Sequence, residues 1–152
     1  MKYLNKFLEA QKDTFEHALF EIKNGKKESH WMWFIFPQLV GLGKSSIAKT
    51  YALADLQEAI DYLAHPILGP RLIECTRAVL ERPETISEIF GHPDHLKFRS
   101  CMTLFAQVSE PGSLFHIALH DKCNNAPDAM TLQLLNAKPG CFTAHGRDAC
   151  GT

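Results

Sequence analysis

Apolar residues recur every three or four positions along most of this chain, and this spacing limits the fold to helices. In the first 24 residues it predicts one long amphipathic helix, from about residue 4 to 24. Similar apolar stripes, bounded by glycine, proline or capping residues, predict further helices, at about residues 46–51, 55–65, 68–82, 93–108, 113–119 and 128–135, with a short turn of helix at 86–90. No segment sustains the alternation of a strand. We therefore expect an all-α fold, a compact array of about six to seven helices.

Helix starts are marked by side chains that can accept hydrogen bonds from exposed backbone amides. Asp55 with Glu58, and Thr85 with Glu88, have the spacing of a capping box. Ser113 and Asp128 stand in front of two later apolar stripes and are expected to cap them. These signals divide the chain from residue 55 onward into separate helices.

The length of 152 residues suits a single helical domain, which we place at residues 1–136. The remaining segment, 137–152, is rich in small residues and glycine and has no apolar period. We expect it to be a flexible tail, because it cannot bury enough surface to become ordered.

Charge and composition argue against several classes of function. Lysine plus arginine number 16 and aspartate plus glutamate 17, so the net charge of -1 argues against nucleic-acid binding as the main role. Apolar runs are far shorter than the ~20 residues that span a bilayer, and the first residues lack the apolar segment of a signal peptide. The five cysteines are widely spaced and never form a CxxC motif, which argues against a zinc ribbon and against a disulfide framework. We expect a cytoplasmic protein that does not bind membranes.

The segment from residue 30 to 46, HWMWFIFPQLVGLGKSS, is the best candidate for a functional site. Six apolar or aromatic residues, 31–36, precede a proline, a glutamine and a glycine-containing loop, and they are predicted to form an extended aromatic segment after the first helix. Two tryptophans close to His30, Gln38 and Lys44 suit the floor and mouth of a ligand pocket better than an ordinary core.

The glycine-rich loop suggests binding of an anion. Backbone amides near Gly43 and Ser45, with Lys44 beside them, would attract a phosphate. A Walker-type nucleotide site is unlike this one, because Gln38 occupies the position of its first glycine and no strand–loop–helix surrounds it. The alternative is a structural loop with solvent-facing lysines.

Aromatic side chains offer a second kind of contact. Trp31 and Trp33 have flat faces on which a base or other planar ligand can stack, while His30 and Gln38 offer hydrogen bonds. The alternative is that the aromatic segment fills the core, which we expect for Phe34 and Phe36.

A polar helix face adds three more candidates. Lys97, Ser100 and Thr103 recur at intervals of three and would share one wall of a pocket, or else form a solvated surface. Asp94, near the start of the same helix, has a sufficient structural role because a negative charge there interacts favourably with the helix dipole.

Catalytic and metal-binding motifs are sparse. If the protein is an enzyme, Glu58 is the first candidate for a general base, although its capping role already explains it. Two histidine pairs, His92 with His95 and His116 with His120, lack further ligands, so we predict no metal and no cofactor.

Several uncommon strings in the chain resemble, in order, those of a family of small bacterial proteins. These strings include HWMWFIFPQ, GLG with a serine two residues later, YAL, HP followed by LG and RL, IFG, and MTLF. The family is known as domain of unknown function 1810, and the resemblance covers about residues 4 to 135. It implies a compact all-helical domain and supplies no activity or catalytic residues.

Two functions agree with these features. The first is a helical domain that binds a small phosphorylated or nucleotide-like molecule, with hydrolysis of that ligand left open. The second is a non-enzymatic protein-interaction module whose tryptophan and phenylalanine cluster receives a partner protein. The sequence does not decide whether the protein is an enzyme.

Overall fold

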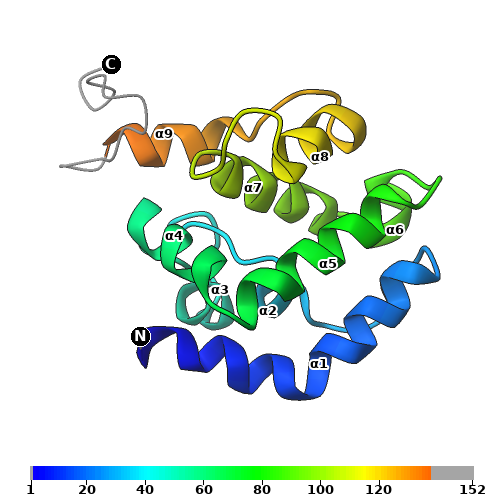
Figure 1. Cartoon of the computed structure of the whole chain (residues 1–152), viewed down its shortest axis with the longest axis horizontal. Coiled ribbons are helices and arrows are strands. Elements are labelled where there is room, and N and C mark those ends of the chain that lie inside the picture. Colours follow the sequence, from blue (N-terminus) through cyan, green and yellow to red (C-terminus); the bar gives the residue numbers. More distant parts are fainter. Residues whose placement is uncertain (1, 138–152) are drawn as a thin grey trace.

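The computed structural model describes residues 2–137 and confirms the all-α prediction. Within this range six helices have nine or more residues, and three shorter ones connect them (Figure 1). In chain order the elements are a 3-10 turn at Lys2–Leu4, α1 (Asn5–Lys23), α2 (Met32–Ile35), α3 (Ser46–Thr50), α4 (Leu56–Ala64), α5 (Leu68–Leu80), α6 (Ile86–Phe90), α7 (Asp94–Ala106), α8 (Leu114–Lys122) and α9 (Ala129–Ala137). The predicted flexible tail lies almost entirely outside the described residues.

Helix α5 is the centre of the array. It packs against α1 on one side and α8 on the other, and it also contacts α2 and α4 (Figure 1). Helix α7 contacts α4, α6, α8 and α9, so the second half of the chain is built around it. Gly69 allows the tight turn from α4 into α5, because a side chain there would lie 2.1 Å from the carbonyl oxygen of Leu63.

The predicted helix starts are confirmed. Asp55 accepts a hydrogen bond from the amide of Glu58 at the start of α4, and Thr85 and Glu88 form a complete capping box at α6. Ser113 caps α8 and Asp128 accepts from the Thr131 amide at α9. Local capping signals therefore placed these helices correctly.

The prediction of an extended aromatic segment is wrong, because its centre forms the helical turn α2. The amide of Phe36 donates to the carbonyl of Met32 at 2.9 Å, and that of Ile35 donates to Trp31 at 3.1 Å. Residues 31, 32, 35 and 36 are buried, whereas 33 and 34 are half-buried, which is a helical pattern. A lone strand would leave its backbone groups without partners, and a helical turn satisfies them within the segment.

Four aromatic rings join α2, α6 and α7 in the core. Trp31 and Phe36 both contact Phe90, whose ring stacks on that of Phe98 at 5.2 Å between centroids. The Phe36 ring also meets that of Phe98 edge to face at 5.2 Å. This cluster fixes α2 against the start of α7, where the candidate site lies.

Among residues 2–137, no helix is both long enough and apolar enough to cross a bilayer.

Candidate functional site

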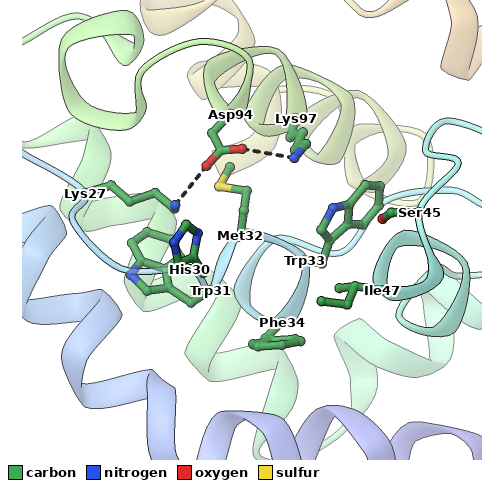
Figure 2. Close-up of a pocket in the computed structure, with 10 residues that line it drawn as sticks. All are labelled: Lys27, His30, Trp31, Met32, Trp33, Phe34, Ser45, Ile47, Asp94 and Lys97. Atoms are coloured by element: carbon green, nitrogen blue, oxygen red, sulfur yellow. Dashed lines mark ion pairs between the residues drawn. The ribbon is translucent and has the colours of Figure 1, made fainter.

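A pocket of about 190 Å³ lies where α2, the loop before it, the start of α3 and the first turn of α7 meet (Figure 2). Three segments far apart in sequence therefore contribute to it. Its walls combine charged groups with aromatic and aliphatic side chains, namely Lys27, His30, Trp31, Met32, Trp33, Phe34, Ser45, Ile47, Asp94 and Lys97.

Asp94 is the charged centre of this pocket, between two lysines (Figure 2). Its carboxylate lies 2.8 Å from the ammonium of Lys27 and 3.0 Å from that of Lys97. Burial alone would raise the pKa of Asp94, but the hydrogen bonds and positive charges of the two lysines outweigh it and lower that pKa. The aspartate is therefore ionised at neutral pH, and one carboxylate faces two ammonium groups.

The two lysines differ in how firmly they are held. Lys27 has a side chain only 8% exposed, and its ammonium lies 5.2 Å from the centre of the Trp31 ring. Lys97 is 30% exposed, and its ammonium lies 5.5 Å from the Trp33 ring. Each cation thus contacts one aromatic face. Lys27 belongs to the pocket floor, whereas Lys97 is the lysine more accessible to a ligand.

The tryptophans have different functions in the wall. The Trp31 side chain is buried. Its indole N–H already donates to Glu21 at 2.8 Å, so only the ring is left to face the site. Trp33 is half-buried, and its indole nitrogen points toward the middle of the pocket (Figure 2). No hydrogen bond to that nitrogen is formed by the described residues. Trp33 therefore offers a ligand both a ring face and a donor.

Glu21, a buried carboxylate on α1, holds the loop that carries His30 and Trp31. It accepts hydrogen bonds from the amides of Glu28 and Ser29, from the Ser29 hydroxyl at 2.5 Å, and from the Trp31 indole. Burial alone would raise the pKa of Glu21, but these four donors lower it to about 2. The loop is thus fixed by one ionised side chain.

Gly43 provides the space in which the Trp33 ring packs. A Cβ atom at position 43 would lie 2.8 Å from Cζ2 of Trp33 and 2.4 Å from the Cβ of Ala48. Both distances are shorter than side chains tolerate. The glycine-rich loop therefore has a packing role that the sequence analysis did not anticipate, next to its predicted role in anion binding.

Five of the nine predicted ligand-binding residues line the pocket together: His30, Trp31, Trp33, Ser45 and Lys97. His30 is exposed at the rim. The Ser45 oxygen accepts a hydrogen bond from the Ala48 amide at 3.1 Å as the cap of α3, so its hydroxyl hydrogen remains able to donate. Their role in binding stays a prediction, but the structure brings them to one place.

The other four predicted residues lie outside this pocket. Gln38 is buried, with its amide nitrogen 3.5 Å from the carbonyl of Phe36, and Lys44 is exposed. Ser100 and Thr103 are buried and donate to carbonyl groups of their own helix. The Thr103 oxygen also accepts from the Asp128 amide at 2.8 Å, which ties α7 to the start of α9.

Glu58, the candidate general base, also lies outside the pocket. Its carboxylate accepts a hydrogen bond from the Ala54 amide at 2.8 Å, one residue before the N-cap of α4. The capping box predicted at α4 is therefore only half formed: Asp55 accepts from the Glu58 amide, but Glu58 accepts from the amide of Ala54 and not from that of Asp55.

Lys27 and Asp94 are the charged pocket residues that the sequence analysis missed. Lys27 lies in a short charged run, 26–28, for which no role was predicted, and Asp94 was explained by the helix dipole. Met32, Phe34 and Ile47 complete the apolar part of the wall. The proximity of Asp94 to Lys97, three residues later on one helix, was the one signal in the sequence that pointed to a shared charged site.

The chemistry of the pocket favours an anion. Five lining side chains can donate hydrogen bonds, namely Lys27, His30, Trp33, Ser45 and Lys97, whereas the one carboxylate is already paired. Among residues 2–137, no group of three or more His, Cys, Asp or Glu side chains has the geometry to hold a metal ion. The pocket thus combines several hydrogen-bond donors with aromatic walls.

Comparisons with known proteins agree on the family and give no activity. No curated protein matches the chain. It is similar to the crystal structure of the conserved hypothetical protein Rv1873 from Mycobacterium tuberculosis, with a TM-score of 0.86 and 43% sequence identity, over 89% of this chain and 97% of that one. The family described as protein of unknown function (DUF1810) matches residues 1–135. This chain therefore belongs to the DUF1810 family.

Proposed function

We propose that the pocket at the start of α7 binds the anionic group of a small phosphorylated or nucleotide-like molecule. The observation that carries this proposal is the charge balance around Asp94. Two ammonium groups lie within 3.0 Å of a single carboxylate, so one positive charge is left for a ligand. Phosphate oxygens accept several hydrogen bonds and are suited to such a set of donors.

The aromatic walls support a planar group next to the anion. Trp33 is half-buried and presents its ring at the mouth, close to Lys97. Stacking on a tryptophan face suits any flat ring, including a nucleobase. The pocket volume of about 190 Å³ is below the ~300 Å³ at the lower end for drug-sized ligands, so it would enclose one part of the molecule.

The pocket supports binding better than hydrolysis. Asp94 is the carboxylate in its wall, and a lowered pKa makes an aspartate a weak general base. Glu58 lies elsewhere. We therefore make ligand binding the primary proposal.

A protein-interaction surface is the second candidate. Ile47 is 52% exposed at the mouth of the pocket, beside the half-buried Trp33 and Phe34. Apolar groups that remain accessible around a pocket are typical of surfaces that receive a partner.

For location we propose the cytoplasm, since Cys75, Cys101 and Cys123 are buried free thiols, as is usual in a reducing compartment.

A thermal-shift and calorimetric comparison of inorganic phosphate, adenosine, AMP and ribose 5-phosphate tests the primary proposal. AMP at 100 times its dissociation constant should stabilise the fold by about 2.7 kcal/mol, and adenosine should bind far more weakly because it lacks the anion. Lys97→Met should abolish the AMP shift, while Trp33→Phe should weaken it by loss of the indole donor.

Lys12→Met is the matched control, because Lys12 is an exposed lysine on α1 and takes no part in the pocket. Equal AMP binding by Lys97→Met and Lys12→Met would refute the proposed site. No shift with any of the anions would also refute it and would favour the interaction surface.

A further inference from the structure

We propose that a second pocket, between α6, α7 and α8, is a separate site for the phosphate or carboxylate group of a small molecule. This cavity has a volume of about 420 Å³ and is mainly polar. Its lining includes Glu84, Ser87, His95, Arg99, Asp121 and Lys122. None of these residues belongs to the pocket around Asp94, so this inference is independent of the proposed function.

Arg99 is the first reason to assign an anion to this cavity. Within the described part of the chain its guanidinium group forms no ion pair, and its Nε atom is buried without a hydrogen-bond partner. Arg99 is half-buried, and its guanidinium interacts with the thiol of Cys123, which does not neutralise the positive charge. A guanidinium group also matches the geometry of carboxylate and phosphate oxygens better than any other side chain.

Lys122 is the second positive charge, and it is held in place before any ligand arrives. Its ammonium donates to the carbonyl of Arg82 at 2.6 Å and to that of Glu84 at 2.8 Å. Both partners are neutral, so these bonds fix the position of the charge without neutralising it. A fixed cation binds an anion with little loss of side-chain entropy.

The carboxylates that line the cavity already have partners. Glu84 is paired with Arg82 through two hydrogen bonds of 2.9 Å, and these also lower the pKa of Glu84. The exposed Asp121 lies 2.8 Å from Nδ1 of His120. The two positive charges of Arg99 and Lys122 therefore outnumber the one negative charge in the lining, that of Asp121, which has no arginine or lysine partner.

His95 completes the donors and acceptors of the cavity. Its Nδ1 atom lies 3.1 Å from the carbonyl oxygen of Gly91, which fixes the ring and places the proton on that nitrogen. In the tautomer with its proton on Nδ1, the Nε2 atom can accept a hydrogen bond from a hydroxyl group of the ligand. The ligand would thus carry an anion and at least one further polar group.

Helix geometry keeps the two pockets apart. Asp94 and Lys97 are three residues apart on one face of α7, whereas His95 and Arg99 are four apart on another. At about 100° per residue, the centres of the two faces differ by roughly 150°. A ligand in one pocket therefore does not touch the side chains of the other.

An NMR titration with inorganic phosphate, at pH 7 and constant ionic strength, tests this inference. Saturable shifts of the backbone amides of Ser87, Arg99 and Asn124 are expected in the wild-type protein. In Arg99→Met these shifts should disappear, while any shift of the Trp33 indole N–H, which reports the other pocket, should remain. Amides at the second pocket that do not move, or move equally in Arg99→Met, would overturn the proposal.

Ser87→Glu keeps the test decisive if Arg99→Met fails to fold. Ser87 is exposed in the first turn of α6, where a glutamate is favourable for the helix, and it would place a negative charge at the cavity. This variant should lose the phosphate shifts at Arg99 and Asn124 by repulsion. Retention of both in Ser87→Glu would contradict the assignment, and Lys12→Met again controls for unspecific loss of charge.

Discussion

Replacing Glu21 by glutamine should weaken the fold in a way that depends on pH. The carboxylate accepts four hydrogen bonds from the loop that carries His30 and Trp31. Its pKa falls from 4.5 to about 2 on folding, which corresponds to roughly 3 kcal/mol of stability at pH 7. Glutamine keeps the shape but not the charge, so Glu21→Gln should lose most of that energy.

The sign of the pH dependence follows from the lowered pKa. Ionised Glu21 stabilises the native state above about pH 5, where the carboxylate of the unfolded chain is also ionised. As the pH falls toward 2 the unfolded chain takes up a proton first, and the contribution disappears. The difference between wild type and Glu21→Gln should therefore shrink from about 3 kcal/mol at pH 7 to about 1 kcal/mol at pH 3.

Urea denaturation at both pH values, followed by far-UV circular dichroism, measures this difference. Tryptophan fluorescence adds a local signal, because the Trp31 indole is one of the four donors. Glu9→Gln, at an exposed position of the same helix, is the matched control and should change stability by less than about 0.5 kcal/mol. A Glu21→Gln effect that is the same at pH 7 and pH 3 would refute the electrostatic explanation.

Three further changes test the packing and charges around the site. Gly43→Ala should destabilise the fold by about 1–3 kcal/mol in urea denaturation and alter Trp33 fluorescence, because the new methyl group overlaps the indole ring. Asp94→Asn should lower the free energy of unfolding by about 2 kcal/mol, measured in the same way, yet raise the affinity for inorganic phosphate in calorimetry, because two lysines then lack their carboxylate. Cys75 and Cys101 should react with a thiol reagent at pH 8 far more slowly in the native protein than in guanidinium, since burial raises the pKa of Cys75 to about 12 and that of Cys101 well above its usual value.

Much of the helical fold was predictable because its signals are local. Asp55, Thr85 and Ser113 accept hydrogen bonds from amides three residues later, which is a contact within one turn. The long amphipathic α1 was visible for the same reason, since a stripe of apolar residues at helical spacing needs no information from the rest of the chain.

Helix α2 was misassigned because its sequence has no period. Six successive apolar residues fit a buried strand or a buried helical turn equally well. The choice is made by distant partners: the carbonyl of Phe34 accepts from Gln11 at 2.8 Å, and the indole of Trp31 donates to Glu21. Both partners belong to α1, so the conformation of α2 depends on tertiary contacts.

The charged half of the site depends on distant contacts in the same way. Lys26 and Lys27 are adjacent, and the sequence around them does not distinguish one from the other. Lys27 nevertheless lines the pocket, whereas Lys26 does not. Its amide donates to the carbonyl of Ile89 at 2.6 Å, and its ammonium reaches Asp94. Both anchors lie more than 60 residues later. The pairing that leaves one positive charge for a ligand arises only when α6 and α7 pack beside the loop that Glu21 holds.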